Sequence, residues 1–318
     1  GQALGGEIIS ALWAPNPLWL LALLPLAAAA AASGGGGDEN PPPPAVHITV
    51  DAPDNTNDNT PQITGTSDAP AGSVVAVLLT DSAGATQTVT TTVQADGSYS
   101  VEPSTPLADG AYSAQATVTA PSGNTASATD TGNIDTTAII TVNAPDLTND
   151  DTPLITGTTT DVEAGQTVTV TITDVNGGTQ VVTTTVQADG SYQIEVPNAL
   201  PDGEYTATAK VADKLGNEAQ ASDPGVVDTT APEITVDVPE HTNDNTPTIT
   251  GTTDAPEGSV VTVVVTDSAG NTQTVTTQVK EDGTYSVEVP EELPEGEYTV
   301  DAGVKDPAGN EGKATDKG

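Results

Sequence analysis

Polar and apolar residues alternate along most of the chain after residue 45, in short runs rich in valine, isoleucine and threonine. A period of two is the pattern of a β-strand that buries one face. In the last third it predicts strands over residues 233–238, 248–252, 259–267, 271–280, 284–289 and 297–305, and a weaker strand after Asn310. Asp-Gly, Ala-Gly-Asn and proline-rich turns separate these runs. Seven short strands in about 90 residues predict a β-sandwich of the immunoglobulin type.

The same pattern occurs three times along the chain. The string Thr-Asn-Asp-(Asn/Asp)-Thr-Pro begins at Thr56, Thr148 and Thr242, and Ile-Thr-Gly-Thr follows each copy. The spacings of 92 and 94 residues are as long as a whole domain, so each repeat should fold around its own core. We therefore expect an all-β chain of three tandem seven-stranded sandwiches in an elongated array. The expected repeats are residues 45–136, 137–229 and 230–318.

The six tyrosines follow the repeat, two in each copy. The second of each pair ends the motif Leu-x-(Asp/Glu)-Gly-x-Tyr, at Tyr112, Tyr205 and Tyr298. This is the position of a tyrosine corner, at the turn before the sixth strand of the sandwich. We expect core side chains whose hydroxyl groups bind backbone, and not ligand-binding residues.

The segment before the repeats has a different composition. Residues 1–33 are mainly apolar, and the stretch 8–32 is long enough for a transmembrane helix. Its three prolines and the lack of flanking Lys or Arg disfavour that interpretation. Two alternatives stay open, a segment lodged in a membrane and an apolar linker that packs on another surface. Residues 34–44 are rich in glycine and then proline, which predicts a flexible joint followed by a stiff spacer.

Acidic residues outnumber basic residues by 45 to 6, which gives a net charge of −39, and the first cation is Lys210. A chain with no basic patch cannot neutralise phosphates, so nucleic acid is excluded as a partner. Anionic membrane surfaces are excluded as electrostatic targets for the same reason. Self-repulsion of this size destabilises a compact state unless counter-ions offset it. Divalent cations are therefore the expected partners.

Further motifs carry a resemblance to a known family. They are the linker Asp228-Thr-Thr-Ala-Pro232, the repeated Thr-Asn-Asp string, and the turns Asp267-Ser-Ala-Gly-Asn271 and Asp306-Pro-Ala-Gly-Asn310. Over residues 45–318 the chain resembles the bacterial Ig-like repeats of giant biofilm-associated (Bap-like) and RTX-type adhesins exported by type I secretion. The resemblance implies an extracellular place on the bacterial cell surface, in a stalk that holds a distal binding domain away from the cell. It also implies calcium between repeats, which stiffens the string. The first linker departs from the pattern, because Ile139 stands where Pro232 stands in the second.

The acidic loops are the candidate metal ligands. Because successive strands alternate in direction, the loops after strands one, three and five lie at the trailing end of a repeat, and the other loops lie at its leading end. The linker and the leading-end loops of the next repeat should then meet at a seam. Carboxylate, amide and carbonyl oxygens suit Ca²⁺ better than Mg²⁺. The candidate ligands are Asp135, Asp161, Glu163, Asp213 and Asn217 at the first seam, and Asp228, Asp254, Glu257, Asp306 and Asn310 at the second.

Plain turn chemistry is the alternative to calcium at each of these loops, because Asp, Asn and Gly are the residues that turns use. The sequence contains no EF-hand loop and no RTX nonapeptide. The sixth loop of the first repeat, Ala120-Pro-Ser-Gly-Asn124, lacks the aspartate. The calcium hypothesis expects this difference, because that loop adjoins the Gly/Pro linker and not another repeat.

No residue pattern indicates an enzyme. The two histidines, His47 and His241, have no counterparts in the other repeats, and the acid pairs lie on repeated turns instead of in one cleft. We expect an adhesin stalk involved in adhesion and biofilm formation, whose host or matrix ligand binds elsewhere in the full protein. Two alternatives stay open. One is a subunit of an extracellular filament that polymerises through its apolar N-terminus. The other is a carbohydrate-binding accessory module, although Trp13 and Trp19 lie outside the repeats and so offer them no aromatic platform.

Overall fold

The computed structural model describes residues 45–318. The apolar segment 1–33, for which two alternatives stay open, and the Gly/Pro-rich linker 34–44 lie outside the described residues. Within residues 45–318 the structure contains no helix with the length and apolar character needed to cross a bilayer. All regular elements of this part are β-strands, as the alternating pattern predicts.

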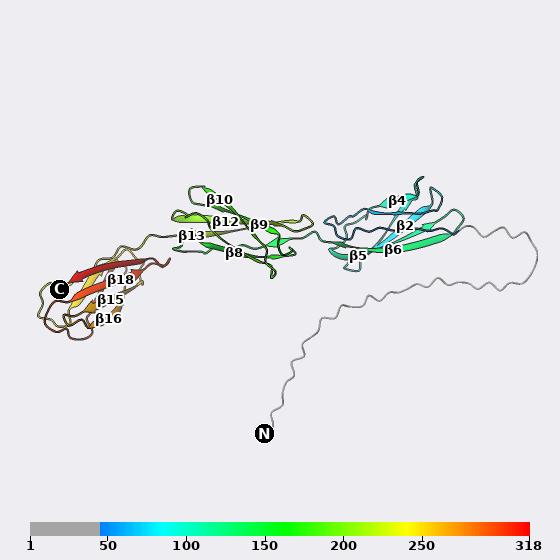
Figure 1. Ribbon diagram of the computed structural model, residues 1–318. Helices are drawn as coiled ribbons and strands as arrows, with labels where there is room; N and C mark the ends of the chain where they lie inside the picture. Colours follow the sequence, from blue (N-terminus) through cyan, green and yellow to red (C-terminus); the bar gives the residue numbers. More distant parts are fainter. Residues whose placement is uncertain (1–44) are drawn as a thin grey trace, which may run out of the picture. The chain divides into compact units, whose positions relative to one another are not determined.

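Three β-sandwiches follow one another along the chain, coloured from blue through green to red (Figure 1). The first contains β1 (Ile63–Thr66), β2 (Val74–Thr80), β3 (Thr86–Thr92), β4 (Ser98–Val101), β5 (Gly110–Thr119) and β6 (Thr125–Ile134). The second contains β7 (Ile139–Ile140), β8 (Leu154–Thr160), β9 (Thr167–Thr173), β10 (Thr179–Thr185), β11 (Ser191–Glu195), β12 (Gly203–Ala212) and β13 (Glu218–Val227). The third contains β14 (Thr248–Thr252), β15 (Val260–Thr266), β16 (Thr272–Gln278), β17 (Thr284–Glu288), β18 (Thr299–Lys305) and β19 (Glu311–Lys317).

Each sandwich has one four-stranded antiparallel sheet and one smaller sheet. The four-stranded sheets have the orders β3-β2-β5-β6, β10-β9-β12-β13 and β16-β15-β18-β19. The smaller sheets are β1-β4, β11-β8-β7 and β14-β17. The first strand predicted in the third repeat, 233–238, is not continuous. It pairs only through two isolated bridges, Ile234 with Thr253 and Asp237 with Thr250, because this segment lies at the sheet edge and exchanges few backbone hydrogen bonds.

Burial follows the predicted period of two. In β2, the side chains of Val75, Val77 and Leu79 are fully buried, while Val74 and Leu78 on the other face are exposed. β-branched residues suit such positions because their stiff side chains pack well on a pleated surface. The buried residues form three separate hydrophobic clusters, one in each sandwich. Each repeat therefore has a core of its own.

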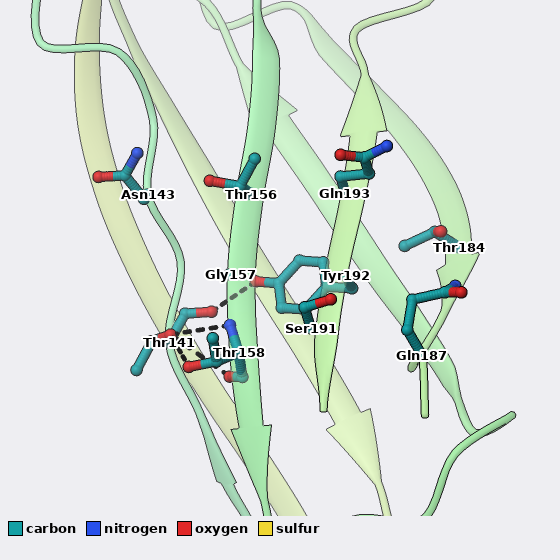
Figure 2. A pocket seen from close by; sticks show the side chains of 10 residues that line it. All are labelled: Thr141, Asn143, Thr156, Gly157, Thr158, Thr184, Gln187, Ser191, Tyr192 and Gln193. Atoms are coloured by element: carbon teal, nitrogen blue, oxygen red, sulfur yellow. Dashed lines mark hydrogen bonds between the residues drawn. The ribbon is translucent and has the colours of Figure 1, made fainter. Parts of the chain in front are cut away.

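Each repeat ties its first segment to the sandwich through tyrosine–glycine pairs. The Tyr192 ring on β11 lies over Gly157 on β8, and its hydroxyl donates a hydrogen bond of 2.6 Å to the Thr141 carbonyl (Figure 2). A Cβ atom at Gly157 would lie 2.2 Å from that carbonyl oxygen and 2.5 Å from the ring, so only glycine fits. Burial raises the pKa of Tyr192 to about 12, which keeps the hydroxyl a neutral donor.

The second tyrosine of each repeat makes the same kind of contact at the sixth strand. Tyr205 is 2 % exposed, lies over Gly225, and donates to the Pro145 carbonyl at 3.4 Å. Tyr112 and Tyr298 bond the corresponding carbonyl oxygens of their own repeats. The expectation of core tyrosines bonded to backbone is confirmed. Their partners lie in the segment after the first strand, about 60 residues upstream, and not in the adjacent turn as in a tyrosine corner.

Candidate functional site

The linker between two sandwiches is held from one side by the preceding repeat. In the loop before β12, the Asp202 carboxylate accepts hydrogen bonds from the backbone N–H of Thr229 at 3.0 Å, from its hydroxyl at 2.7 Å, and from the Thr230 hydroxyl at 2.8 Å. These bonds, first the one from the Thr229 hydroxyl, hold the pKa of Asp202 below its usual value. At the first seam Asp109 plays the same part, with a 2.8 Å bond from the Thr136 hydroxyl. At each seam, the loop that carries this aspartate is thus bonded to the Asp-Thr-Thr start of the linker that follows its repeat.

The linker is held from its other side by the following repeat. In the turn between β12 and β13, the Asn217 side-chain N–H₂ donates to the carbonyl oxygen of Asp135 in the linker at 2.7 Å. The same group donates to the Asp213 carboxylate at 2.7 Å. Asp213 also accepts bonds from the backbone N–H groups of Leu215 and Asn217. One asparagine side chain therefore connects the turn of the second repeat to the end of the first.

The second seam has the same arrangement. Asn310 donates to the Asp228 carbonyl oxygen at 2.7 Å and to the Asp306 carboxylate at 2.9 Å. The Thr-Asn-Asp loop of the preceding repeat also reaches this turn, since the Asn149 side-chain nitrogen lies 3.5 Å from the position that a Cβ atom of Gly309 would take. Two seams of different sequence thus share one pattern of contacts. We use seam for this set of linker, trailing-end loop and leading-end turn.

The Asp213 carboxylate is the most buried charge at either seam, with only 7 % of the residue exposed. Burial alone raises its pKa, but the hydrogen bonds from Asn217, Gly216 and Leu215 outweigh that effect and lower it. The group is therefore ionised at neutral pH. The pKa of Asp306 is lowered by the same balance of burial against hydrogen bonds.

The structure brings together six of the ten residues predicted as metal ligands. They are Asp135, Asp213 and Asn217 at the first seam and Asp228, Asp306 and Asn310 at the second. A seventh residue, Glu163, joins the first turn through a 3.1 Å bond to its carboxylate from the Lys214 backbone N–H.

The other three predicted ligands make no hydrogen bond to a linker in the part of the chain that the structure describes. Asp254 instead accepts a 2.8 Å bond from the Glu233 backbone at the start of its repeat. Asp161 takes a left-handed backbone conformation with φ of 57°, which a turn aspartate tolerates. Glu257 is exposed. The threonine clamps on Asp109 and Asp202 were not predicted, although the repeated Asp-Thr-Thr string was their signal in the sequence.

The oxygen donors at each seam have the right chemistry for calcium, namely a carboxylate, an amide oxygen and a backbone carbonyl. Within residues 45–318, however, no three Asp, Glu, His or Cys side chains converge in a group that could hold a metal. Three of the acceptor positions of Asp213 are already filled by N–H donors. The oxygen atoms at each seam are of the kind that calcium binds, and N–H donors already occupy several of them.

The turn that carries the seam asparagine also occurs away from any seam. In Asp267-Ser-Ala-Gly-Asn271, between β15 and β16, Asn271 donates to the Asp267 carboxylate at 2.9 Å from its side chain and at 2.8 Å from its backbone. This turn shows that the motif forms without a linker beside it. Asn217 and Asn310 differ from Asn271 by the bond to the linker carbonyl and by being partly buried, whereas Asn271 is exposed.

A family model described as bacterial Ig-like domain matches residues 49–136, 141–229 and 235–317. The chain belongs to the bacterial Ig-like domain family. Each match covers the main strands of one sandwich, and β7 (Ile139–Ile140) lies just before the second match. The resemblance that the sequence motifs indicate is thereby confirmed. Among curated proteins none matches the chain.

Solved structures of adhesins are similar to this bacterial Ig-like chain. One is a tetra-tandem repeat in the extending region of a large adhesion protein, with 36 % identity and a TM-score of 0.37 over 86 % of this chain and 73 % of that one. A 1.5-MDa bacterial ice-binding adhesin has 24 % identity and a TM-score of 0.40 over 86 % and 95 %. A Ca²⁺-stabilised adhesin of an Antarctic bacterium has 28 % identity and a TM-score of 0.37 over 86 % and 72 %.

Proposed function

We propose that the chain is part of the extender, or stalk, of a bacterial cell-surface adhesin, with a mechanical role in adhesion. The observation that carries this proposal is the linker held from both sides at both seams. When every linker is held by the same hydrogen bonds, each repeat is held in a similar orientation to the one before it. The sequence likeness to the extending region of a large adhesion protein supports it. An extracellular location, export by type I secretion and a role in biofilm formation belong to the same proposal.

We further propose that calcium binds at the seams and stiffens the stalk. Asp135, Asp213 and Asn217 would hold it at the first seam, with Glu163 beside them, and Asp228, Asp306 and Asn310 at the second. A divalent cation would supply attraction between carboxylates that otherwise repel one another in a chain of net charge −39. The similar adhesin described as Ca²⁺-stabilised supports this proposal.

Thermal unfolding in calcium and in magnesium tests the calcium proposal. A ligand that binds the native state alone raises stability, by roughly 1.4 kcal/mol at ten times its Kd. We expect calcium to raise Tm, magnesium to raise it less, and the double variant Asp228→Ala with Asp306→Ala to lose the response of the second seam. The double variant Glu281→Ala with Glu292→Ala changes the charge equally at exposed positions of the third repeat and should keep it. Equal responses to the two ions, or an unchanged calcium response in the seam variant, would refute the proposal.

A further inference from the structure

A row of three polar side chains crosses the smaller sheet of the second repeat. Asn143 pairs with Thr156 on β8, and Thr156 pairs with Gln193 on β11, so the three residues lie at one level on adjacent segments (Figure 2). Asn143 and Gln193 are exposed, and Thr156 between them is partly buried. Within residues 45–318 none of these three side chains makes a hydrogen bond. Two amide groups and one hydroxyl are thus presented to solvent.

The row borders an open depression of about 750 Å³. Its lining consists of threonine, serine, asparagine and glutamine side chains around Gly157 and the edge of Tyr192, without a carboxylate or an ammonium group. The Tyr192 ring covers Gly157, so the floor of the depression is formed by this ring and the neighbouring polar side chains. In a chain with 45 acidic residues, this is an uncharged place where a neutral ligand meets no carboxylate.

The two sister repeats differ from the second at this row. The first repeat has Asp51, Thr64 and Ser100 in register, beside a smaller depression of about 530 Å³. The third repeat has Asp237, Thr250 and Ser286. The second repeat therefore carries asparagine in place of a carboxylate at one end of the row and glutamine in place of serine at the other.

Amide side chains recognise a different partner from carboxylates. A carboxylate only accepts hydrogen bonds, whereas an amide both donates and accepts, which matches sugar hydroxyl groups that do both. The three groups are about 4.8 Å apart from strand to strand, so they can contact successive parts of one extended ligand. We propose that the row of Asn143, Thr156 and Gln193 is a binding site for a neutral oligosaccharide chain.

The site adds a function beyond that of an extender, since the stalk would hold a neutral polysaccharide along its side. The Tyr192 ring is buried and offers no platform for stacking, so hydrogen bonds supply the affinity. Hydrogen bonds exchanged with water contribute little each. We therefore expect a Kd on the order of millimolar.

The test uses the full 318-residue chain. Cellohexaose, maltohexaose and laminarihexaose are titrated separately and followed by saturation-transfer NMR and calorimetry, with hexagalacturonate as the acidic counterpart. We expect saturable one-site binding of at least one neutral hexaose, and weaker binding of hexagalacturonate. If no neutral hexaose binds saturably up to roughly ten times the expected Kd, or if hexagalacturonate binds as well, the proposal is wrong.

Two double variants exchange the row between repeats. Asn143→Asp with Gln193→Ser gives the second repeat the residues of its sisters, so folding should be preserved, and we expect affinity to fall about tenfold or more. Asp51→Asn with Ser100→Gln gives the first repeat the row of the second, and we expect the stoichiometry to rise from one to two. Unchanged affinity in the first variant, or unchanged stoichiometry in the second, would overturn the assignment to this row.

Discussion

Asn217 and Asn271 lie in two turns of the same type, and only Asn217 touches a linker. Asn217 donates from its side chain to the Asp213 carboxylate and to the Asp135 carbonyl. Asn271 donates from its side chain to the Asp267 carboxylate alone. Replacing each asparagine by alanine removes a bond to the aspartate of its own turn, and only Asn217→Ala also removes the bond to the linker.

The structure sets the size of each effect. A hydrogen bond to a carboxylate contributes about 1.5 kcal/mol, and one between neutral groups contributes about 1 kcal/mol. Asn217→Ala loses one of each, so the second repeat should lose roughly 2.5 kcal/mol. Asn271→Ala loses one bond at an exposed turn, where solvent screening brings the effect to about 1 kcal/mol or less. The difference is about 1.5 kcal/mol, of which the linker bond supplies about 1 kcal/mol and the greater exposure of the Asn271 turn supplies the rest. It corresponds to a factor of about ten in an opening equilibrium.

Native-state hydrogen exchange read by mass spectrometry measures both variants in the same way. Peptides from β12 and β13 report the second repeat, and peptides from β15 and β16 report the third. We expect Asn217→Ala to speed exchange in its own repeat about tenfold more than Asn271→Ala does in the third. Equal acceleration in the two variants would refute the reasoning, because the linker bond would then add nothing to the turn.

Two further predictions concern the tyrosine–glycine contact and the clamp on the linker. Gly157→Ala should destabilise the second repeat by about 3 kcal/mol in chemical denaturation, because its Cβ would overlap backbone and ring atoms. Gly303→Ala in β18, where the new Cβ meets no atom closer than 3.7 Å, should change stability by less than about 1 kcal/mol, and an equal loss in both would contradict the model. Asp202 should titrate by NMR below its ordinary pKa of 3.8. The folded pKa is lower than the unfolded one, so the stabilising contribution of Asp202 is fully present above its unfolded pKa and is lost as the pH falls through the folded pKa. A midpoint at or above 3.8 would disprove the clamp.

Much of the fold could be predicted because burial of one face imposes a period of two. The predicted strands 248–252 and 259–267 agree with β14 and β15 to within a residue at each end. The sheet to which the fourth strand belongs could not be predicted. The alternation in β16 is compatible with either sheet, and only the structure shows that it pairs with β15 and not with β17.

The seams could be predicted in outline because alternating strand directions decide which loops share an end. That rule placed Asp213 and Asn217 beside the linker, where the structure has them. It could not predict that the Asn217 side chain would donate to the Asp135 carbonyl, because that bond depends on the path of the linker backbone. The bond of the Tyr205 hydroxyl to backbone was predicted, but its partner, Pro145, was not, because Pro145 is distant in sequence and comes close only when the sandwich closes.

The central claim is that the seams decide whether the three repeats form a stiff stalk or a flexible one. Small-angle X-ray scattering of residues 45–318, with calcium and then with a chelator, tests it most directly. The account predicts a well-defined maximum dimension and a narrow distribution of shapes in calcium, with a broader distribution after chelation. Identical scattering curves under the two conditions would contradict the proposed calcium-stiffened stalk.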